Sequence, residues 1–491
     1  MTFRVSGLYS GLDTDQIVAQ LMAIERRPLQ LLEQRQRTYE LRKELWNEIS
    51  SSLSALKDAI TKLKTPETVL PYKVTTSDAA VATGAVTAVT RIVPGTYTLK
   101  IGQLATAHRV WGDQKTGWTA GQAPDLTLTF DITVDGVTTT ATITAEATDT
   151  LQDIARRINA ANLGIHATVI DNRLYLEHDR TGTGNTIAVH DTGLARDLGL
   201  VDPATGQVKY QRLPQDAILY INDLPVTSQS NTLKDVISGL EVTLLKAGTD
   251  PSSPATVTLI VAQDLDAAVA NIKAWVEKYN ATLDLITTRL QEQTVQNPTT
   301  DAERKKGLLR GDFLLSSLKS RLRQAVSNPV IANPPLAYDR LSAIGITTSG
   351  ADRGLSGKLE IDETKLRNAL ATNPEAVLAL FNQEADVDGD GTVTAGEQGI
   401  AVRLLRELEA YIASGTRTVG GTTVRAGLIP ARLDELQRVI DDYDRRIEAF
   451  ERVLDQREQA LYRQFTAMEM ALSSLQNQAT YLAQQLISWM Q

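Results

Sequence analysis

The chain of 491 residues contains no cysteine. That absence excludes disulfide bonds, thiol nucleophiles and zinc sites built from cysteine. Aromatic residues make up only 5% of the chain and the net charge is −9, so no basic excess points to nucleic acid or an anionic membrane. The length predicts roughly three domains of about 150 residues each.

Long hydrophobic runs are also missing. No run of 18 apolar residues occurs, so we expect no transmembrane helix. The opening MTFRVSGLYSGLDTDQ lacks a basic region followed by an apolar core, which is what a general secretory signal requires. If the protein leaves the cell, we therefore expect it to use another route.

Apolar residues at helical spacing occupy the N-terminal region. Asp13 is a candidate N-cap, Ile17, Leu21 and Ile24 follow it, and Pro28 ends this helix or begins the next. The second predicted helix reaches about residue 64, with apolar positions Ile49, Leu53, Leu56, Ile60 and Leu63.

The C-terminal region carries the longest seam of apolar residues, and a further seam lies mid-chain. The C-terminal seam is Leu433, Leu436, Ile440, Tyr443, Ile447, Phe450 and Leu454, then, after an interruption at Arg457, Leu461, Phe465, Met468, Leu472, Leu475, Ala479, Leu482, Leu486 and Trp489. The mid-chain seam is Val269, Ile272, Val276, Tyr279, Leu283, Ile286 and Leu290. Seams of this 3.5-residue period need partner helices. We expect the inner parts to pair within one chain and the outermost turns to pair with other chains.

Between the helical ends, apolar residues alternate with polar ones, which is typical of β-strands. Residues 125–146 alternate around the turn Asp135–Gly136, and residues 70–105, 165–192 and 216–260 show similar strands. One helix is predicted at 150–162, with an apolar face of Leu151, Ile154, Ala155 and Ile158.

These patterns predict an α+β multidomain protein. We expect an elongated helical stalk, in which coiled-coil-like helices from both termini join a mid-chain helix, and two projecting β-rich modules. The expected domains are N-terminal stalk helices (1–66), an inner β domain in two parts (67–107 and 213–262), an outer β-rich domain (108–212), a helical stalk domain (263–430) and a C-terminal coiled-coil helix (431–491).

The stretch DVDGDGTVTAGE, residues 386–397, matches the calcium-binding loop of an EF-hand. Such loops place oxygen ligands at positions 1, 3, 5, 7, 9 and 12 and glycine, here Gly391, at position 6. The candidate ligands are Asp386, Asp388, Asp390, Thr392, Thr394 and Glu397. A helix should enter at about 374–383 and another leave from about 400.

A single loop without a second one to pair with favours weak affinity, on the order of 10⁻⁴ to 10⁻³ M. We therefore interpret calcium as a structural ion rather than a signal. The alternative is a solvated turn that holds no ion.

Other candidate chemistry is weak. The four histidines, His108, His166, His178 and His190, lack metal-ligand spacing, and TGTGN at 181–185 lacks the third glycine of a nucleotide loop. No catalytic constellation can be singled out from spacing, and a glycosidase carboxylate pair would not be visible in this way. We expect no enzyme and no catalytic residue.

Several stretches, in order along the chain, resemble flagellar filament-capping proteins (FliD, flagellar hook-associated protein 2). They include GLYSGLDTDQIVAQLMAIERRPL at the start, PGTYTLKIGQLATA, INDLPVTSQSNTLKDVISGLEVTLLKAG, GKLEIDETKLRNALATNPEAVLALF and the tail YRQFTAMEMALSSLQNQATYLAQQL. Residues 150–176 are similar to a β-α-β unit of flagellins and their caps. The calcium-like loop lies outside the resemblance.

The resemblance implies a structural assembly protein at the distal tip of the bacterial flagellar filament, which promotes folding and insertion of exported flagellin. It implies an extracellular location reached by the flagellar type III route without a cleaved signal peptide. The implied partners are other copies of the chain in a ring of five or six, flagellin, hook–filament junction proteins and an export chaperone, with no nucleic acid and no membrane insertion. The alternative function is a calcium-stabilised extracellular adhesin or surface-binding protein.

Overall fold

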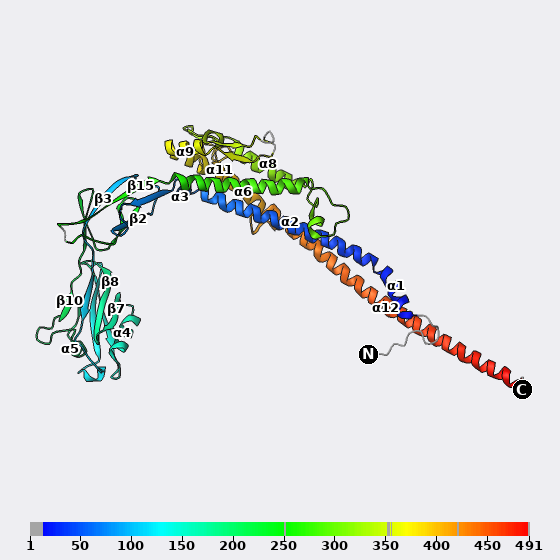
Figure 1. Ribbon diagram of the computed structural model, residues 1–491, viewed down its shortest axis with the longest axis horizontal. Coiled ribbons are helices and arrows are strands. Elements are labelled where there is room, and N and C mark those ends of the chain that lie inside the picture. The colour runs from blue at the N-terminus through cyan, green and yellow to red at the C-terminus, as the bar shows by residue number, and fades with distance from the viewer. Residues whose placement is uncertain (1–12, 250–251, 351–353, 355, 420–421, 490–491) are drawn as a thin grey trace. The chain divides into compact units, whose positions relative to one another are not determined.

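A computed structural model describes residues 13–249, 252–350, 354, 356–419 and 422–489. The chain divides into a helical unit, Met1–Thr65 with Val269–Gln491, and a β-rich unit, Pro66–Ala268. The α+β multidomain class is therefore confirmed (Figure 1). Residues 7–12 of the predicted N-terminal motif lie outside the described residues. Among the described helices, none is long and apolar enough to cross a membrane.

The helical unit collects helices from both termini and from the middle of the chain. Its elements are α1 (Thr14–Glu25), α2 (Arg27–Leu63), most of α6 (Leu265–Gln291), α7 (Asp301–Lys305), α8 (Phe313–Ser327), a 3₁₀ turn (Leu341–Ile344), β16 (Ile346–Thr348), β17 (Leu359–Ile361), α9 (Glu363–Thr372), α10 (Pro374–Asn382), α11 (Ile400–Ile412), β18 (Thr416–Val419), β19 (Thr422–Arg425) and α12 (Leu428–Trp489). Asp13 caps α1 through its side chain, which accepts the N–H of Gln16 at 3.0 Å, and Pro28 lies in the first turn of α2, as predicted.

The core of the helical unit is the mid-chain seam packed beside α2. Ile49, Leu53, Leu56 and Ile60 of α2 are fully buried, and so is every predicted seam residue of α6 except the half-buried Leu290. A polar contact fixes how the two helices pair, because the hydroxyls of Ser52 and Thr282 lie 2.9 Å apart. The inner parts of the predicted seams therefore pair within the chain.

The β-rich unit begins with α3 (Pro66–Val69) and contains an inner module of two antiparallel sheets. The five-stranded sheet has the order β1 (Tyr72–Thr76), β15 (Ala255–Gln263), β3 (Gly95–Gln103), β11 (Ala217–Ile221) and β12 (Leu224–Ser228). The three-stranded sheet has the order β13 (Thr232–Ile237), β14 (Leu240–Leu244) and β2 (Ala82–Val86). Side chains from both sheets, such as Leu99, Leu219 and Leu240, share one apolar core.

An outer module is inserted between β3 and β11, two strands that pair with each other. One sheet has the order β10 (Tyr210–Arg212), β4 (Ala107–Trp111), β8 (Arg173–Thr181) and β7 (Ile165–Ile170). The other has the order β6 (Val137–Thr144), β5 (Thr127–Val134) and β9 (Thr186–Val189), and the module also holds a 3₁₀ turn (Ala120–Gln122), α4 (Leu151–Ala160) and α5 (Gly193–Asp197).

Local sequence explains these elements. In the β5–β6 turn, Asp135 and Gly136 have φ of 51° and 82°, which is the left-handed geometry of a tight hairpin turn. The predicted helix forms as α4, with a capping box between Thr150 and Asp153. Its face of Leu151, Ile154, Ala155 and Ile158 is buried in the module's core, as predicted.

The TGTGN stretch, residues 181–185, joins the outer module to the inner one. Thr183 donates from its N–H to Asp216 at 2.7 Å, and the Thr181 hydroxyl donates to the Gln229 carbonyl at 2.6 Å. Gly182 has φ of 93°, and a Cβ there would collide with Gln229. The glycine is therefore required by a close backbone approach.

His108 is a buried histidine of the outer module. It is 3% exposed, its Nδ1 accepts the N–H of Ile187 at 2.8 Å, and its Nε2 lies 3.0 Å from the Gln211 side-chain oxygen. Burial, with a smaller contribution from His178, lowers the pKa of His108 below its ordinary value of 6.5. A histidine with a lowered folded pKa stabilises the fold above the unfolded pKa, and that stability is lost as the pH falls.

We expect the unfolding midpoint in urea to fall between pH 7.5 and pH 5 as protons bind the unfolded chain. In a His108→Gln variant, which keeps one donor and one acceptor, the fall should be smaller. Equal pH profiles for the two proteins would show that His108 does not cause the acid sensitivity.

Candidate functional site

The inner half of α12 forms the predicted seam with the N-terminal helices. Leu436, Ile440 and Leu454 are buried, and the seam residues between them are half-buried. Tyr443 stacks on Tyr39 of α2 with ring centroids 5.6 Å apart. This part of α12 lies alongside α2 and α1 (Figure 1).

The predicted apolar face of α1 is wrong by one residue. Leu21 is 39% exposed and Ile24 is 59% exposed, whereas Val18 and Met22 are buried in a cluster with Leu29, Leu454 and Leu461. Both faces of α1 carry apolar residues, so spacing alone did not select the face that meets α12. The consequence is a second apolar strip on α1 that faces solvent in the single chain.

The interruption of the seam at Arg457 coincides with the junction of α1 and α2. Arg457 lies 3.7 Å from Glu25, and Arg26 lies 3.9 Å from Glu458. Exposed pairs of this kind contribute little stability, about 0–1 kcal/mol, but their geometry favours one alignment of the helices. Arg445 and Arg446 pair with Asp442 of their own helix, which fits a solvated face there.

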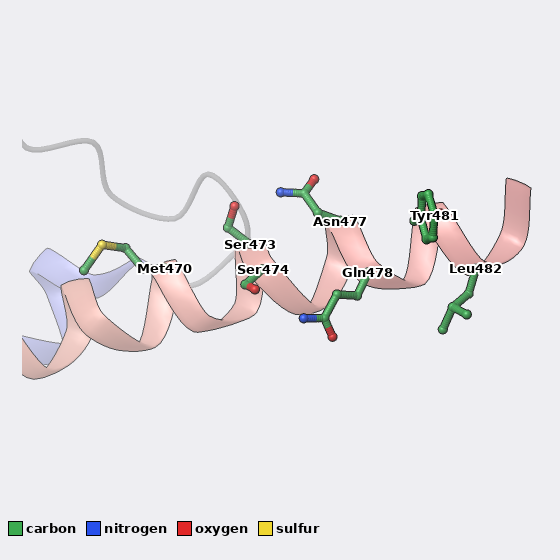
Figure 2. Close-up of a pocket in the computed structure, with 7 residues that line it drawn as sticks. All are labelled: Met470, Ser473, Ser474, Asn477, Gln478, Tyr481 and Leu482. Carbon is green, nitrogen blue, oxygen red and sulfur yellow. The ribbon is translucent and has the colours of Figure 1, made fainter.

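The outer part of α12 carries its apolar residues without a covering element among the described residues. Met470 is 64% exposed, and Leu475, Leu482 and Leu486 are between 58% and 64% exposed. Figure 2 shows that Met470, Tyr481 and Leu482 project from one helix, with serine and amide side chains between them. The hollow is open, and every described residue that lines it belongs to α12. The side chain of Trp489 lies outside the described part of the structure.

The calcium-like loop connects α10 to α11, close to the predicted helix ends. Asp386 accepts the N–H groups of Gly389 at 2.8 Å and of Gly391 at 2.9 Å, and Asp390 accepts the N–H and hydroxyl of Thr392, both at 2.7 Å. Gly391 has φ of 86°, a conformation that glycine adopts without strain. The loop therefore folds back on its own aspartates.

Three of the predicted ligands converge. Carboxylate oxygens of Asp386, Asp388 and Asp390 lie within 4.8 Å of one another, which is the one cluster of three or more acidic or histidine groups with this spacing among the described residues. All three side chains are exposed. The donor set, hard carboxylate oxygens, fits calcium.

The carboxylate of Glu397 does not belong to that cluster, although one of its oxygens accepts the backbone N–H of Asp388 at 3.3 Å. Glu397 is 3% exposed, and its two oxygens accept the N–H groups of Val387 at 2.8 Å and Thr394 at 2.7 Å, together with the Thr394 hydroxyl at 2.7 Å. These bonds lower the pKa of Glu397 from 4.5 to about 2. Its stabilising effect is thus present above pH 4.5 and is lost as the pH falls toward 2. The predicted ligand Thr394 donates its N–H and its hydroxyl to Glu397. Through these bonds and the one from Val387, Glu397 joins the two ends of the loop.

Sequence reasoning missed Arg403, a buried arginine in the first turn of α11 that ties the residues just after the loop to the C-terminal end of α8. Arg403 is 4% exposed and donates to the carbonyls of Asn328 at 2.9 Å, Pro329 at 3.0 Å and Gln398 at 3.0 Å. A fourth bond, at 3.2 Å, reaches the carbonyl of Ala325 in the last turn of α8, where a cation is favoured by the helix dipole. An arginine inside the apolar run IAVRLL was the signal that could have found it.

Comparisons with known proteins agree across most of the chain. Three family models match: "Flagellar hook-associated protein 2 C-terminus" over residues 214–477, "Flagellar hook-associated protein 2 N-terminus" over 10–108, and "Flagellin hook IN motif" over 129–178. The first of these spans more than half of the 491 residues.

Curated relatives also match most of the chain. The A-type flagellar hook-associated protein 2 of Pseudomonas aeruginosa is 29% identical over 512 residues, covering 99% of this chain and 97% of the relative. The flagellar hook-associated protein 2 of Halalkalibacterium halodurans is 28% identical over 437 residues, covering 78% of this chain and 80% of the relative. The crystal structure of the D1-D2-D3 domains of the flagellar cap protein FliD from Escherichia coli matches with a TM-score of 0.62 at 24% identity, over 80% of this chain and 99% of that chain, which shows a shared fold.

Proposed function

The chain belongs to the flagellar hook-associated protein 2 family, and from this membership we propose how its described parts serve a filament cap. It is a structural protein of the flagellar filament cap, and its location is the flagellum. Promotion of flagellin folding and insertion is the work that we assign to the cap. Catalysis has no part in this proposal.

The proposal depends on a difference between the two halves of the apolar seam of α12. The inner half of α12 is covered by α1 and α2, whereas Leu475, Leu482 and Leu486 are exposed. Solvent-exposed apolar side chains at helical spacing are typical of a surface that is buried on assembly. We propose that the outer seam and the exposed Leu21 and Ile24 of α1 bind other subunits.

The finer statements follow from the family and remain proposals. We propose a ring of five or six copies, with flagellin and the hook–filament junction proteins as neighbours and an export chaperone before secretion. We propose export by the flagellar type III route without a cleaved signal peptide. The proposed domains keep the boundaries 1–66, 67–107, 108–212, 213–262, 263–430 and 431–491.

We also propose calcium as a structural ion of the helical unit, bound weakly by the loop at 386–397. The convergence of Asp386, Asp388 and Asp390 supports it, because a cation offsets the repulsion among three carboxylates. Thr392 would add its carbonyl oxygen, as position 7 of such loops does. Glu397 and Thr394 would complete the set only if Glu397 turned away from some of its present N–H donors.

Deletion of the gene tests the cap role. We expect short or absent filaments and monomeric flagellin in the medium, because flagellin subunits that are not retained at the tip escape. Electron microscopy of the cells and an immunoassay of the medium measure both, with restoration by the native gene as the control. Filaments of normal length and number would contradict the proposal.

The same experiment separates the alternative function. A calcium-stabilised adhesin that had no cap role would leave polymerisation of flagellin intact and remove only attachment to a surface. Attachment and capping are compatible in one protein, because the β-rich unit has its own cores and the seam belongs to the helical unit.

A further inference from the structure

Three aromatic side chains form a row across one sheet of the outer module. Trp111 of β4 lies opposite Tyr175 of β8 on one side and opposite Tyr210 of β10 on the other. The ring centroids of Trp111 are 6.4 Å from those of Tyr175 and 6.3 Å from those of Tyr210, and the ring planes agree within 18° and 6°. In a chain with 5% aromatics, such a row is a concentrated feature.

The row lies on the outer face of the sheet. Strand side chains alternate, and Val110, Leu174 and Leu176 point into the core that also holds the apolar face of α4. The aromatic residues occupy the opposite face, where Trp111 and Tyr175 are half-buried and Tyr210 is 36% exposed. Figure 1 shows α4 alongside this sheet.

A second row, of charged residues, runs beside the aromatic one. Arg109 lies opposite Glu177 and Arg212 in the strand register, and its guanidinium is 2.8 Å from the Glu177 carboxylate. Both arginines lie near enough to Tyr175 to act on its hydroxyl electrostatically. Burial nevertheless raises the pKa of Tyr175, so its hydroxyl stays protonated and able to donate.

A third cation lies at the end of the aromatic row. The ammonium of Lys209 is 5.1 Å from the centroid of the Tyr210 ring and 2.9 Å from the Asp113 carboxylate. Together with Arg109 and Arg212, this gives three cations against the two carboxylates of Glu177 and Asp113. Arg109 is paired with Glu177 and Lys209 with Asp113, so the positive excess of these five groups comes from Arg212.

The aromatic ladder also holds the three-residue edge strand β10 in place, since aromatic cross-strand pairs stabilise sheets. Any set of packed aromatic side chains would stabilise the edge strand in this way. It does not require an adjacent row of arginines and an exposed tyrosine beside a lysine.

The combination matches the chemistry of a carbohydrate. Aromatic rings present an electron-rich face to the C–H groups of a sugar ring, and guanidinium groups bind hydroxyls and carboxylates through fixed pairs of donors. An excess of positive charge selects sugars that carry carboxylates. The overall acidity disfavours nucleic acid, which needs a broad basic footprint.

We propose that the outer sheet face at Trp111, Tyr175 and Tyr210, with Arg109 and Arg212, is a binding surface for acidic glycans. It is separate from the terminal seam, so the inference goes beyond the role in capping. If the surface did not bind acidic glycans, the proposed role in filament capping would be unaffected.

The test uses the full chain and four probes in isothermal titration calorimetry and ligand-observed NMR. Oligogalacturonate and sialyllactose carry both the sugar ring and the carboxylate, the methyl ester of oligogalacturonate loses the charge, and polyaspartate keeps the charge without sugar. We expect binding of the acidic glycans, weaker binding of the ester, and weak or no binding of polyaspartate.

Variants then locate the site. Tyr210→Ser and Arg212→Ser should each weaken binding of the acidic glycan roughly tenfold, as removal of a central contact does. The matched control is Tyr220→Ser, because Tyr220 is 40% exposed on the inner module. Arg212→Ser keeps the aromatic row intact, so a loss in that variant is not explained by misfolding of β10.

Failure of both acidic glycans to bind would overturn the proposal. Equal binding of polyaspartate would overturn it too, by showing a surface for any anion. Loss of binding in Tyr220→Ser, or unchanged binding in both Tyr210→Ser and Arg212→Ser, would place the glycan elsewhere and reject this surface. Filament formation in a Tyr210→Ser strain reports separately on the cap role.

Discussion

A chain that ends after Leu454 is expected to lose filament capping while both β modules stay folded. The truncation removes the outer seam together with Leu461, which packs on Val18 and Met22 of α1. The two β cores draw all their buried residues from 81–261, so they keep every one of them. Complementation of the deletion strain, with filament length and released flagellin as readouts, measures the loss.

A full-length variant separates assembly from helix stability. Leu475→Ser with Leu482→Ser alters two exposed positions and leaves the contacts between α12 and α1 in place. We expect this double variant to fold as the native chain does and to cap poorly. If the truncated chain or the double variant capped filaments normally, the outer seam would not be the assembly surface.

Removal of calcium is expected to lower the melting temperature of the helical unit. A ligand at about 100 times its Kd adds about 2.7 kcal/mol to the free energy of unfolding. For a unit of this size that is a shift in melting temperature of roughly 4–5 °C. Differential scanning calorimetry in 10 mM calcium and in excess chelator, where 10 mM is about 100 times a Kd of 10⁻⁴ M, measures the difference.

Substitutions in the loop separate the aspartates that would bind calcium from the glutamate that holds the loop without it. Asp388→Asn with Asp390→Asn should abolish the calcium-dependent difference and change the melting temperature little in chelator, because both side chains are exposed. Glu397→Gln should lower the melting temperature in both conditions, since its carboxylate accepts loop N–H groups without an ion. A native chain that melts at the same temperature with and without calcium would reject the ion.

Local signals predicted much of the fold. The seam of α6, the capping box of α4 and the turn at Asp135–Gly136 each depend on residues close together in the sequence, and each forms as expected. The family resemblance likewise rests on contiguous stretches. Such features need no knowledge of what packs against them.

The features that sequence reasoning missed depend on distant partners. The face of α1 is chosen by Leu454 and Leu461 of α12, and Arg403 is buried because carbonyls at 325–329 lie over it. The row of Trp111, Tyr175 and Tyr210 exists only through the strand register. The loop motif predicted the clustering of three aspartates but not that Glu397 would bind backbone N–H groups instead.

The insertion of the outer module between β3 and β11 has a consequence for how the module can be altered. These strands are antiparallel neighbours, so the module leaves and re-enters the inner sheet at the two arms of what would otherwise be a hairpin. The bridge between Thr106 and Gln215 closes that opening. A module mounted in this way can be exchanged, shortened or replaced without altering the sheet that carries it. A change confined to this module would alter the surface that the module presents and leave the residues of the terminal helices unchanged.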